Sequence, residues 1–522
     1  MPVRPKLRLG LVLENLQPPG WIHALIERLS QTQSIELAVV VVTGSAPTAD
    51  HPAGYRLYNW LEDRLFKPGR DALAARDATD LLARVPQVEL AATWKGDDLH
   101  LDNTALLEAH GIEIFLHLGP TRLAGPILEL APHGVWWYGP DSFALRPVLA
   151  REPVTPSTLV RLGQTPASDA LLCASYGRTH RVSVNLNRSQ ARWKSAAFAP
   201  RLLQRLYHQG HLEESAPPPP TKPPSNTALL GLLGGHLGRC LGLGVDKVQR
   251  RGQWTLLYGL GDNPLQRGEQ FTELIPPADR CWADPFIVYQ QNRYYVFFEE
   301  LIFARKRAHL AVMEMDEAGQ WTAPVKILQR DYHLSYPFVF VVDGTYYMIP
   351  ETAANRTVEV YRCEEFPHRW TFYKNLMEGV RAADTTLHQH QGRWWLWTNM
   401  AEGEGTSTRD EVFLFYADHP LSTSWTPHPL NPVVSDVRWA RPAGRLFERE
   451  GQLIRPSQDG SVRYGYCLHF NRVTHLSPTQ YREEPVHTLG PDWTPDLVGV
   501  HTYNHAHRLT LIDGKFQRRR FG

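Results

Sequence analysis

The sequence predicts two fold classes in one chain: a Rossmann-like α/β domain, followed by an all-β domain that closes as a five-bladed β-propeller. Three observations support this expectation. Strand-like apolar runs alternate with helical stretches up to about residue 209, a proline-rich segment follows, and a degenerate repeat of roughly 50 to 60 residues fills the remainder. A chain of 522 residues is long enough for two such domains. We expect the α/β domain at 1–210, a linker at 211–248 and the propeller at 249–522.

The first part has the pattern of a parallel-sheet α/β domain. Short apolar runs predict strands at 9–13, 35–42, 113–118 and 134–138. The stretches between them predict helices at 21–29, 72–83 and 104–110. The prolines at 217–220 and 223–224 then favour an extended, poorly packed chain, so this segment is the predicted domain boundary.

Each repeat of the second part opens with a short polar-apolar step, followed by a strand, a turn and an aromatic strand. The openings are Ala-Asp-Pro-Phe at 283–286, Ser-Tyr-Pro-Phe at 335–338, Ala-Asp-Thr-Thr at 383–386, Ala-Arg-Pro-Ala at 440–443 and Val-His-Thr-Tyr at 500–503. Five openings predict five blades. The last one leaves too few residues for four strands, so we expect 254–258 to complete that blade and protect the edges of the ring.

The repeat register selects candidate site residues, because the innermost strand of each propeller blade points its first residues at the central channel. These residues are Asp284, Tyr336, Asp384, Arg441 and His501. Two carboxylates, a phenol, a guanidinium and an imidazole on one axis suit acid–base work on a sugar. The alternative is structural, since Asp-Pro and Tyr-Pro pairs also open strands or cap turns.

Further polar residues are expected to line the same channel. Glu299, Glu300 and Glu351 end second strands and could supply a further carboxylate; the alternative, a solvated strand-end charge, is favoured more for Glu299 than for the other two. His333, just before the second opening, is a further expected substrate-binding residue. On the fourth blade a dense polar cluster is predicted to bind hydroxyls or a phosphate, because Arg suits planar recognition of anions; its members are Arg455, Gln458 and Asp459.

Charge and composition restrict the partners. Lys and Arg total 55 against 54 Asp and Glu, so a net charge of +1 provides no broad field to hold a nucleic acid or an anionic membrane. We expect a glycan or sugar-phosphate as small-molecule partner. Arg8 and Glu14 interrupt the apolar run near the start, so neither a signal peptide nor a membrane span is predicted.

The five cysteines are isolated, odd in number and without a CxxC pair, which argues against a disulfide framework or a zinc site. A reducing compartment is the simplest interpretation, and we expect a cytoplasmic protein. No ligand spacing singles out a metal. The sequence therefore predicts no metal and no cofactor.

Seven motifs in order identify a family resemblance for the second part, at 282–286, 296–300, 333–340, 347–352, 383–387, 393–397 and 455–459. Together they resemble the N-terminal propeller domain of plant glucosamine inositolphosphorylceramide transferases and its bacterial relatives. The transferase activity of that family lies in a separate domain that this sequence lacks, so the resemblance implies the fold and not that activity.

The architecture also resembles, more distantly, the five-bladed arabinanase and β-xylosidase hydrolases. That resemblance implies a base Asp on the first blade, a pKa-modulating Asp on the second and an acid Glu on the third. Asp284 matches the first position, while Tyr336 and Asp384 stand at the other two. It therefore implies Asp284 as base or nucleophile, and Asp384 or Glu351 as acid.

The first part resembles the folate-dependent formyltransferases over about residues 7–205, through the segments 10–14, 106–118 and 128–139. Active members of that family need an Asn and a His two residues apart in the last segment. This chain has Trp137 and Gly139 there, and neither can replace an amide or an imidazole. We expect formyl transfer to be absent, with Trp136, Trp137 and Tyr138 in the core or lining a leftover pocket.

These observations favour a carbohydrate-active enzyme of bacterial polysaccharide or glycolipid metabolism that cleaves or transfers a glycosyl unit at the propeller axis. A non-catalytic glycan-binding or scaffolding propeller is the main alternative. A sugar N-formyltransferase is a further alternative, and it would need an Asn-His constellation elsewhere in the first domain.

Overall fold

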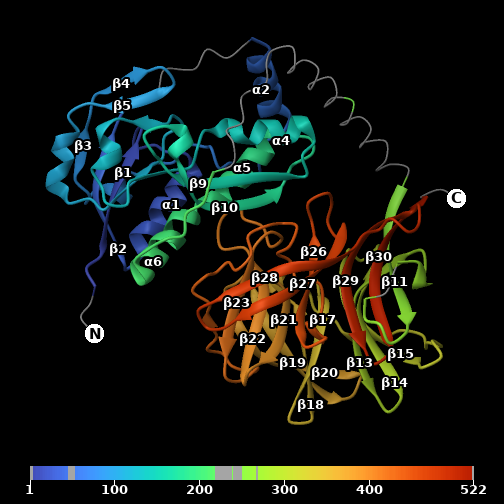
Figure 1. Ribbon diagram of the computed structural model, residues 1–522. Coiled ribbons are helices and arrows are strands. Elements are labelled where there is room, and N and C mark those ends of the chain that lie inside the picture. The colour runs from blue at the N-terminus through green and yellow to red at the C-terminus, as the bar shows by residue number, and fades with distance from the viewer. Residues whose placement is uncertain (1–3, 45–52, 218–237, 239–249, 266–267, 520–522) are drawn as a thin grey trace. The chain divides into compact units, whose positions relative to one another are not determined.

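The computed structural model describes residues 4–44, 53–217, 238, 250–265 and 268–519. The chain divides into two compact units (Figure 1). The first comprises Met1–Cys240 with Gly403–Thr406, and the second, called the propeller unit below, comprises Leu241–Glu402 with Ser407–Gly522. Most of the proline-rich segment lies outside the described residues, so the linker bounds 211–248 stay a prediction.

The first unit is built on a seven-stranded sheet of order β10-β9-β8-β6-β1-β2-β3. Its strands are β1 (Leu7–Leu13), β2 (Ile35–Val42), β3 (Gln87–Glu89), β6 (Ile114–His117), β8 (Val135–Trp137), β9 (Val154–Arg161) and β10 (Ala170–Arg178). The pairs from β3 to β8 are parallel, but β9 and β10 are antiparallel. The expectation of a parallel sheet is therefore met only in part, and the formyltransferase resemblance stays a prediction.

Helices and a small sheet complete the first unit. The helices are α1 (Gly20–Gln31), α2 (Ala53–Leu65), α3 (Thr79–Leu82), α4 (Leu145–Ala150), α5 (Val184–Ser195) and α6 (Phe198–Gln209), and the small sheet consists of β4 (Ala92–Lys95), β5 (Asp98–Leu101) and β7 (Leu123–Ala124). The predicted helix at 72–83 is wrong except for α3, and the one at 104–110 is a 3₁₀ helix.

Strand β1 lies in the middle of this sheet and is buried on both faces, as a central parallel strand must be. Leu9 and Leu11 pack with α1 and α6 in one hydrophobic cluster, whereas Val12 packs in a second cluster on the other face. Gly10 permits the close approach of β6, since a Cβ there would lie 2.6 Å from the ring of Phe115. Trp136 and Tyr138 belong to the first cluster, as expected for core residues.

The propeller unit contains five four-stranded sheets, which are the five predicted blades. Blade one has β13 (Arg280–Gln290), β14 (Arg293–Ile302), β15 (Arg307–Asp316) and β16 (Val325–Leu328), and blade two has β17 (Ser335–Val342), β18 (Thr345–Glu351), β19 (Thr357–Glu365) and β20 (Arg369–Glu378). Blade three has β21 (Ala382–His390), β22 (Arg393–Met400), β23 (Val412–Ala417) and β24 (Thr426–Pro427). Blade four has β25 (Phe447–Arg449), β26 (Gln452–Asp459), β27 (Cys467–Leu476) and β28 (Tyr481–Leu489).

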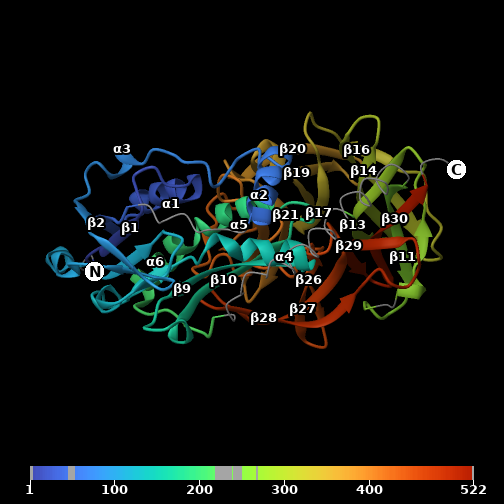
Figure 2. The same ribbon diagram turned by 90° about the horizontal axis from the view of Figure 1, so that it is seen from above.

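Blade five joins the two ends of the propeller unit. Its strands β29 (Leu497–Ala506) and β30 (Leu509–Arg519) pair with β11 (Arg250–Leu260) and β12 (Thr272–Leu274) in the order β12-β11-β30-β29. Strands β11 and β30 lie side by side in Figures 1 and 2 and pair along their whole length. The predicted closure through 254–258 is thus observed, and it leaves no unpaired edge between the first and last strands of the ring.

The blade openings share one backbone irregularity. The pairing register shifts between Ala283 and Phe286, between Ser335 and Phe338, and between Ala383 and Thr386. At the bulged position the backbone is left-handed, with φ of 52° at Asp284, 47° at Tyr336 and 54° at Asp384. Such bulges re-aim a side chain. The three openings are therefore structurally equivalent, as the repeat register predicts.

Candidate active site of the propeller unit

One polar side chain from each blade meets in a cluster that we call the axial cluster: Asp284, Glu351, Asp384, Arg441 and His501. Glu351 keeps 19% of its side-chain exposure and Arg441 keeps 10%, whereas Asp384 and His501 keep 2% each. A ligand would therefore meet the glutamate and the guanidinium first. Four of the five members were predicted from the blade openings, and Glu351 from the end of a second strand.

Asp284 is held by donors from both neighbouring blades. The hydroxyl of Thr502 donates to its Oδ1 at 2.6 Å, and the backbone N–H of Tyr336 donates to its Oδ2 at 3.2 Å. His501 Nε2 lies 3.6 Å from the same Oδ1. Asp284 is only 4% exposed. The His501 imidazole orients its carboxyl group, but the two groups do not form a close ion pair.

Arg441 connects the other two carboxyl groups. Its Nε and one terminal nitrogen donate to the two oxygens of Asp384, at 2.5 and 3.1 Å, and the same terminal nitrogen lies 3.3 Å from Glu351. The amide of Gln458 donates to Asp384 at 3.2 Å, which also agrees with its expected place near the site. Asp384 is thus a fully paired carboxylate, whereas Glu351 shares one guanidinium contact.

Burial raises the pKa values of two carboxyl groups of this cluster, Asp284 and Glu351. It raises the pKa of Asp284 to about 7, against the opposing charge of His501 and with the help of Glu299 and Asp384. Burial and the Asp384 charge raise the pKa of Glu351 to about 8, although Arg441 opposes the rise. Three carboxyl groups in one dry site cannot all ionise easily. The two groups therefore titrate where a general base and a general acid are useful near neutral pH.

These raised pKa values predict a pH-dependent stability. In the unfolded chain the two groups titrate near 3.9 and 4.3, so above that range the folded state binds more protons than the unfolded state. The two groups therefore stabilise the fold fully below about pH 4, and this stabilisation is lost as the pH rises through 7 and 8. We expect the free energy of unfolding to fall across this window.

Asp284→Asn or Glu351→Gln should each reduce that slope by up to about 1.4 kcal/mol per pH unit. Denaturant unfolding at several pH values between 5 and 9 measures the slope for the parent and both variants. Identical slopes in all three proteins would show that neither carboxyl group carries the shifted proton.

His501 and His333 are both buttressed by carboxylates. His501 Nδ1 lies 2.6 Å from Asp513 Oδ1, and although burial lowers the pKa of His501, the charges of Asp513 and Asp284 raise it overall. His333 Nε2 lies 3.3 Å from Glu299, which outweighs burial and raises the pKa of His333 to about 9. Both histidines therefore bring positive charge toward the carboxyl groups of the cluster.

Glu299, and not Glu300, lies on the face of β14 that points toward Asp284. Glu299 pairs with His333 and its charge acts on Asp284. Glu300 lies on the opposite face of β14, where His309 at 3.0 Å and the Trp282 indole at 2.9 Å outweigh burial and lower its pKa to about 2. Glu300 points to the face opposite Glu299, because successive side chains of a strand alternate, and its role in substrate binding stays a prediction.

Tyr336 shares the backbone position of the two aspartates but not their surroundings. Its ring is completely buried and packs edge-on against Phe286, with ring centroids 4.8 Å apart. Its hydroxyl accepts from the backbone N–H of Gly444 at 2.7 Å and bonds Thr386 at 2.8 Å. The phenol therefore ties blades two, three and four together through its hydroxyl, and its role in substrate binding stays a prediction.

Arg455 and Asp459 also lie away from the axial cluster. Arg455 is fully buried and forms a two-point ion pair with Glu483 at 2.7 and 2.6 Å, and its terminal nitrogens also donate to the backbone carbonyls of Ala440 and Trp439. Asp459 is the neighbour of Gln458 in β26 and belongs to a separate group with Cys467 and His469. Both side chains are engaged inside blade four, and their role in substrate binding stays a prediction.

Two aromatic residues that the sequence analysis did not assign to the site complete it. Trp254 stacks on His501 with ring centroids 4.0 Å apart, and Tyr464 meets the same imidazole edge-on at 5.3 Å. The Arg441 guanidinium carbon lies 5.2 Å from the Tyr464 ring centre.

Asp284, His501 and Asp513 could also hold a cation, since each offers a ligand atom within 4.8 Å of the others. Asp513 is engaged by the backbone N–H groups of Asp284 and Thr502 and by His501. These hydrogen bonds already satisfy the Asp513 oxygens, so the hydrogen-bonded arrangement accounts for the group without an ion.

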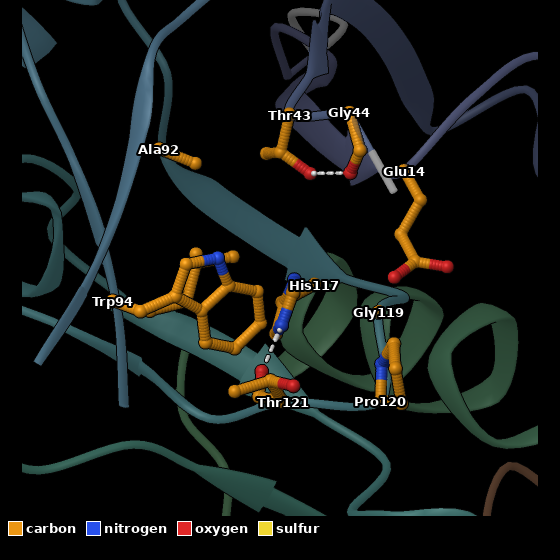
Figure 3. Close-up of a pocket in the computed structure, with 10 residues that line it drawn as sticks. Glu14, Thr43, Gly44, Ala92, Trp94, His117, Gly119, Pro120 and Thr121 are labelled. Atoms are coloured by element: carbon orange, nitrogen blue, oxygen red, sulfur yellow. Dashed lines mark hydrogen bonds between the residues drawn. The ribbon is translucent and has the colours of Figure 1, made fainter. Parts of the chain in front are cut away.

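The first unit has a pocket of its own where β1, β2 and β6 end (Figure 3). Glu14 and Thr43 follow two of these strands, and Trp94 faces His117 across the pocket. His117 Nε2 donates to the carbonyl of Thr121 at 2.6 Å, and burial lowers its pKa to about 4. The carboxyl ends of parallel strands are the usual ligand edge of such sheets.

Comparison with known proteins finds a family model that matches most of the propeller unit. Residues 263–499 match the family model described as "Glucosamine inositolphosphorylceramide transferase 1, N-terminal". The resemblance predicted from the seven motifs is thereby confirmed. The matched segment contains the blade openings at Asp284, Tyr336, Asp384 and Arg441 and ends just before His501.

Curated relatives show the same likeness. Glucosamine inositolphosphorylceramide transferase 1 of Oryza sativa subsp. japonica is 33% identical over 207 residues, which are 39% of this chain and 28% of the relative. The protein of that name from Arabidopsis thaliana is 32% identical over 227 residues, or 43% of this chain and 29% of the relative. The chain thus matches less than a third of the length of these transferases.

Solved structures with some likeness are glycoside hydrolases. A family 117 glycoside hydrolase of Zobellia galactanivorans is 13% identical with a TM-score of 0.34, over 51% of this chain and 90% of that chain. The catalytic domain of the Coprinopsis cinerea GH62 α-L-arabinofuranosidase is 10% identical with a TM-score of 0.35, over 50% of this chain and 97% of that chain.

Proposed function

We propose that the propeller unit is carbohydrate-active and cleaves or transfers a glycosyl unit at the axial cluster. The observation that carries the proposal is the meeting of three carboxyl groups from three blades with a single guanidinium and a single imidazole, which leaves Asp284 and Glu351 with pKa values of about 7 and 8. Pairs of titratable groups whose environments shift their pKa values identify acid and base partners. The match to the N-terminal region of a glucosamine-transferring family supports a carbohydrate ligand.

In the proposed hydrolysis each residue has a role. Asp284 accepts a proton from water, whose oxygen then attacks the anomeric carbon. The bond from that carbon to the leaving oxygen breaks as Glu351 gives its proton to this oxygen. In glycosyl transfer an acceptor hydroxyl takes the place of water. Asp384, held by Arg441, keeps the proton on Glu351 through its charge.

The test is a screen of the purified full chain against amino-sugar and furanosyl glycans, with products detected by mass spectrometry. We expect at least one glycan to yield a product. Because Asp284 must be ionised and Glu351 protonated, kcat/KM should be greatest between about pH 7 and 8 and fall on both sides. A product formed with a maximum below pH 5 would assign the chemistry to other residues.

A non-catalytic glycan-binding or scaffolding propeller is the second candidate function. Two observations favour it: the phenol of Tyr336 turns into the core at an opening where the hydrolases carry an acid, and Asp384 is paired with Arg441. Under this alternative a glycan of the same screen binds but yields no product at any pH between 5 and 9. Binding without product would therefore decide between the two.

We infer that the first unit does not transfer a formyl group, which leaves the sugar N-formyltransferase alternative without support. The Trp137 indole donates to the carbonyl of Gly119 at 3.0 Å, and Gly139 has no group to titrate.

No helix in the part of the chain that the structure describes is long and apolar enough to cross a membrane.

A cytoplasmic location and a role in bacterial polysaccharide or glycolipid metabolism remain our proposals. Among the described residues, Cys281, Cys363 and Cys467 are free thiols, and a reducing compartment keeps thiols in that state.

A further inference from the structure

Blade four contains a group of three metal-ligating side chains apart from the axial cluster: Asp459, Cys467 and His469. Asp459 ends β26 and faces Cys467 directly in the register with β27, while His469 follows two residues later and so points to the same side of that strand. All three residues are buried, at 8%, 4% and 7% exposure. The hairpin therefore brings together an oxygen, a sulfur and a nitrogen that the sequence separates.

The ligand atoms are almost equally spaced. Cys467 Sγ lies 3.8 Å from Asp459 Oδ2 and 3.7 Å from His469 Nε2, and Nε2 lies 3.7 Å from Oδ2. A hydrogen bond between the imidazole and the carboxylate would bring them to about 2.7–3.2 Å. A tetrahedral zinc ion, with bonds of about 2.0–2.3 Å, separates its ligand atoms by roughly 3.3–3.6 Å. The observed triangle is within a few tenths of an ångström of that geometry.

The remaining atoms of the group are held as metal ligands usually are. His469 Nδ1 lies 2.8 Å from the hydroxyl of Thr488, which leaves Nε2 as the free ring nitrogen of the triangle. Asp459 Oδ1 accepts from the backbone N–H of Ser461 at 2.7 Å, which leaves Oδ2 to face inward. The Trp439 ring covers the imidazole, with centroids 4.0 Å apart. Such outer partners orient the ligands of metal sites.

We propose that Asp459, Cys467 and His469 bind a zinc ion that joins β26 to β27, with water as the fourth ligand. Thiolate, imidazole and carboxylate are the ligand types that zinc takes, and hard cations such as Ca²⁺ disfavour the thiol. On binding, the Cys467 thiol gives its proton to solvent and its sulfur pairs with the metal. The neighbouring residue Gln458 donates to Asp384, so the ion also anchors one support of the axial cluster. This site does not depend on the proposed carbohydrate activity.

The experiment uses the full chain, stripped with a chelator and titrated with ZnCl₂ against a chromophoric indicator. We expect one tight zinc per chain, a higher Tm in its presence and, with Co²⁺ instead, a thiolate-to-cobalt charge-transfer absorption. Cys467→Ala and His469→Gln should lose the tight zinc and the absorption. Thr488→Val should weaken binding by about 10- to 100-fold, as expected for an outer partner.

Cys281→Ala is the matched control, because it also removes a buried free cysteine, in β13, but leaves the triangle intact. It should bind zinc like the parent. The proposal is overturned if the parent takes up no zinc, or if Cys467→Ala and His469→Gln, shown by circular dichroism to be folded, still bind one zinc per chain with the affinity of the parent.

Discussion

Asp284→Asn is expected to lower turnover of a glycan substrate by about 10²–10⁴-fold, or more if the carboxylate acts as nucleophile. The substitution keeps the size of the side chain and its acceptor oxygen for Thr502, but removes the charge and the basicity. The fold should survive, because removing a buried charge close to other carboxyl groups relieves repulsion. Turnover and ligand affinity are measured together, with thermal melting as the folding control.

Asp279→Asn is the matched control for this substitution. Asp279 lies just before the same blade, is 59% exposed and pairs with Arg280 at the surface, so turnover should stay at the parental level. If Asp284→Asn only weakens binding, by about the 1.5–3 kcal/mol of a charged hydrogen bond, the site binds glycan without acting on it. Full turnover of Asp284→Asn would remove the proposed base from the mechanism.

Arg455→Met is expected to lower the free energy of unfolding of the propeller unit by about 3–5 kcal/mol. The change leaves Glu483 buried without its two guanidinium donors, and it frees the carbonyl of Trp439, which Arg455 also reaches at 2.7 Å. An uncompensated buried charge is among the most costly single changes in a protein. Denaturant unfolding followed by near-ultraviolet circular dichroism measures the loss.

Arg472→Met provides the comparison, because Arg472 of β27 pairs with Glu484 of β28, the residue next to Glu483, but is 37% exposed. An exposed pair contributes about 0–1 kcal/mol, so this variant should be nearly as stable as the parent. Equal losses in the two variants would mean that burial does not set the cost. Unchanged stability of Arg455→Met together with lost glycan affinity would support the substrate-binding role first predicted for Arg455.

The blade openings were predictable because repetition makes the backbone equivalent without any knowledge of contacts. Asp284 and Asp384 have the same bulge and both side chains reach the axial cluster. Tyr336 has that bulge too, but its larger, partly apolar side chain is more stable in the core, where Gly444 and Thr386 satisfy its hydroxyl. Equivalent backbone positions therefore predict the place of the Cα atom in the blade, but not which groups the side chain contacts.

The features that the sequence analysis did not predict all depend on pairing between distant residues. Glu299 and Glu300 are adjacent, and only the register of β14 against β13 decides which one faces the site. Arg455 is taken up by Glu483, 28 residues further along the chain. In the first unit, β9 and β10 are antiparallel because the chain turns back at the sheet edge, which the alternation of strands and helices does not reveal.

The most direct test of the central claim is a crystal structure of Asp284→Asn with a glycan found by the screen, since this variant should bind without turning it over. We predict that the sugar lies at the axial cluster, with its glycosidic oxygen within about 3 Å of Glu351 and its anomeric carbon facing residue 284. A glycan bound elsewhere on the chain, with the axial cluster free of sugar, would contradict the account.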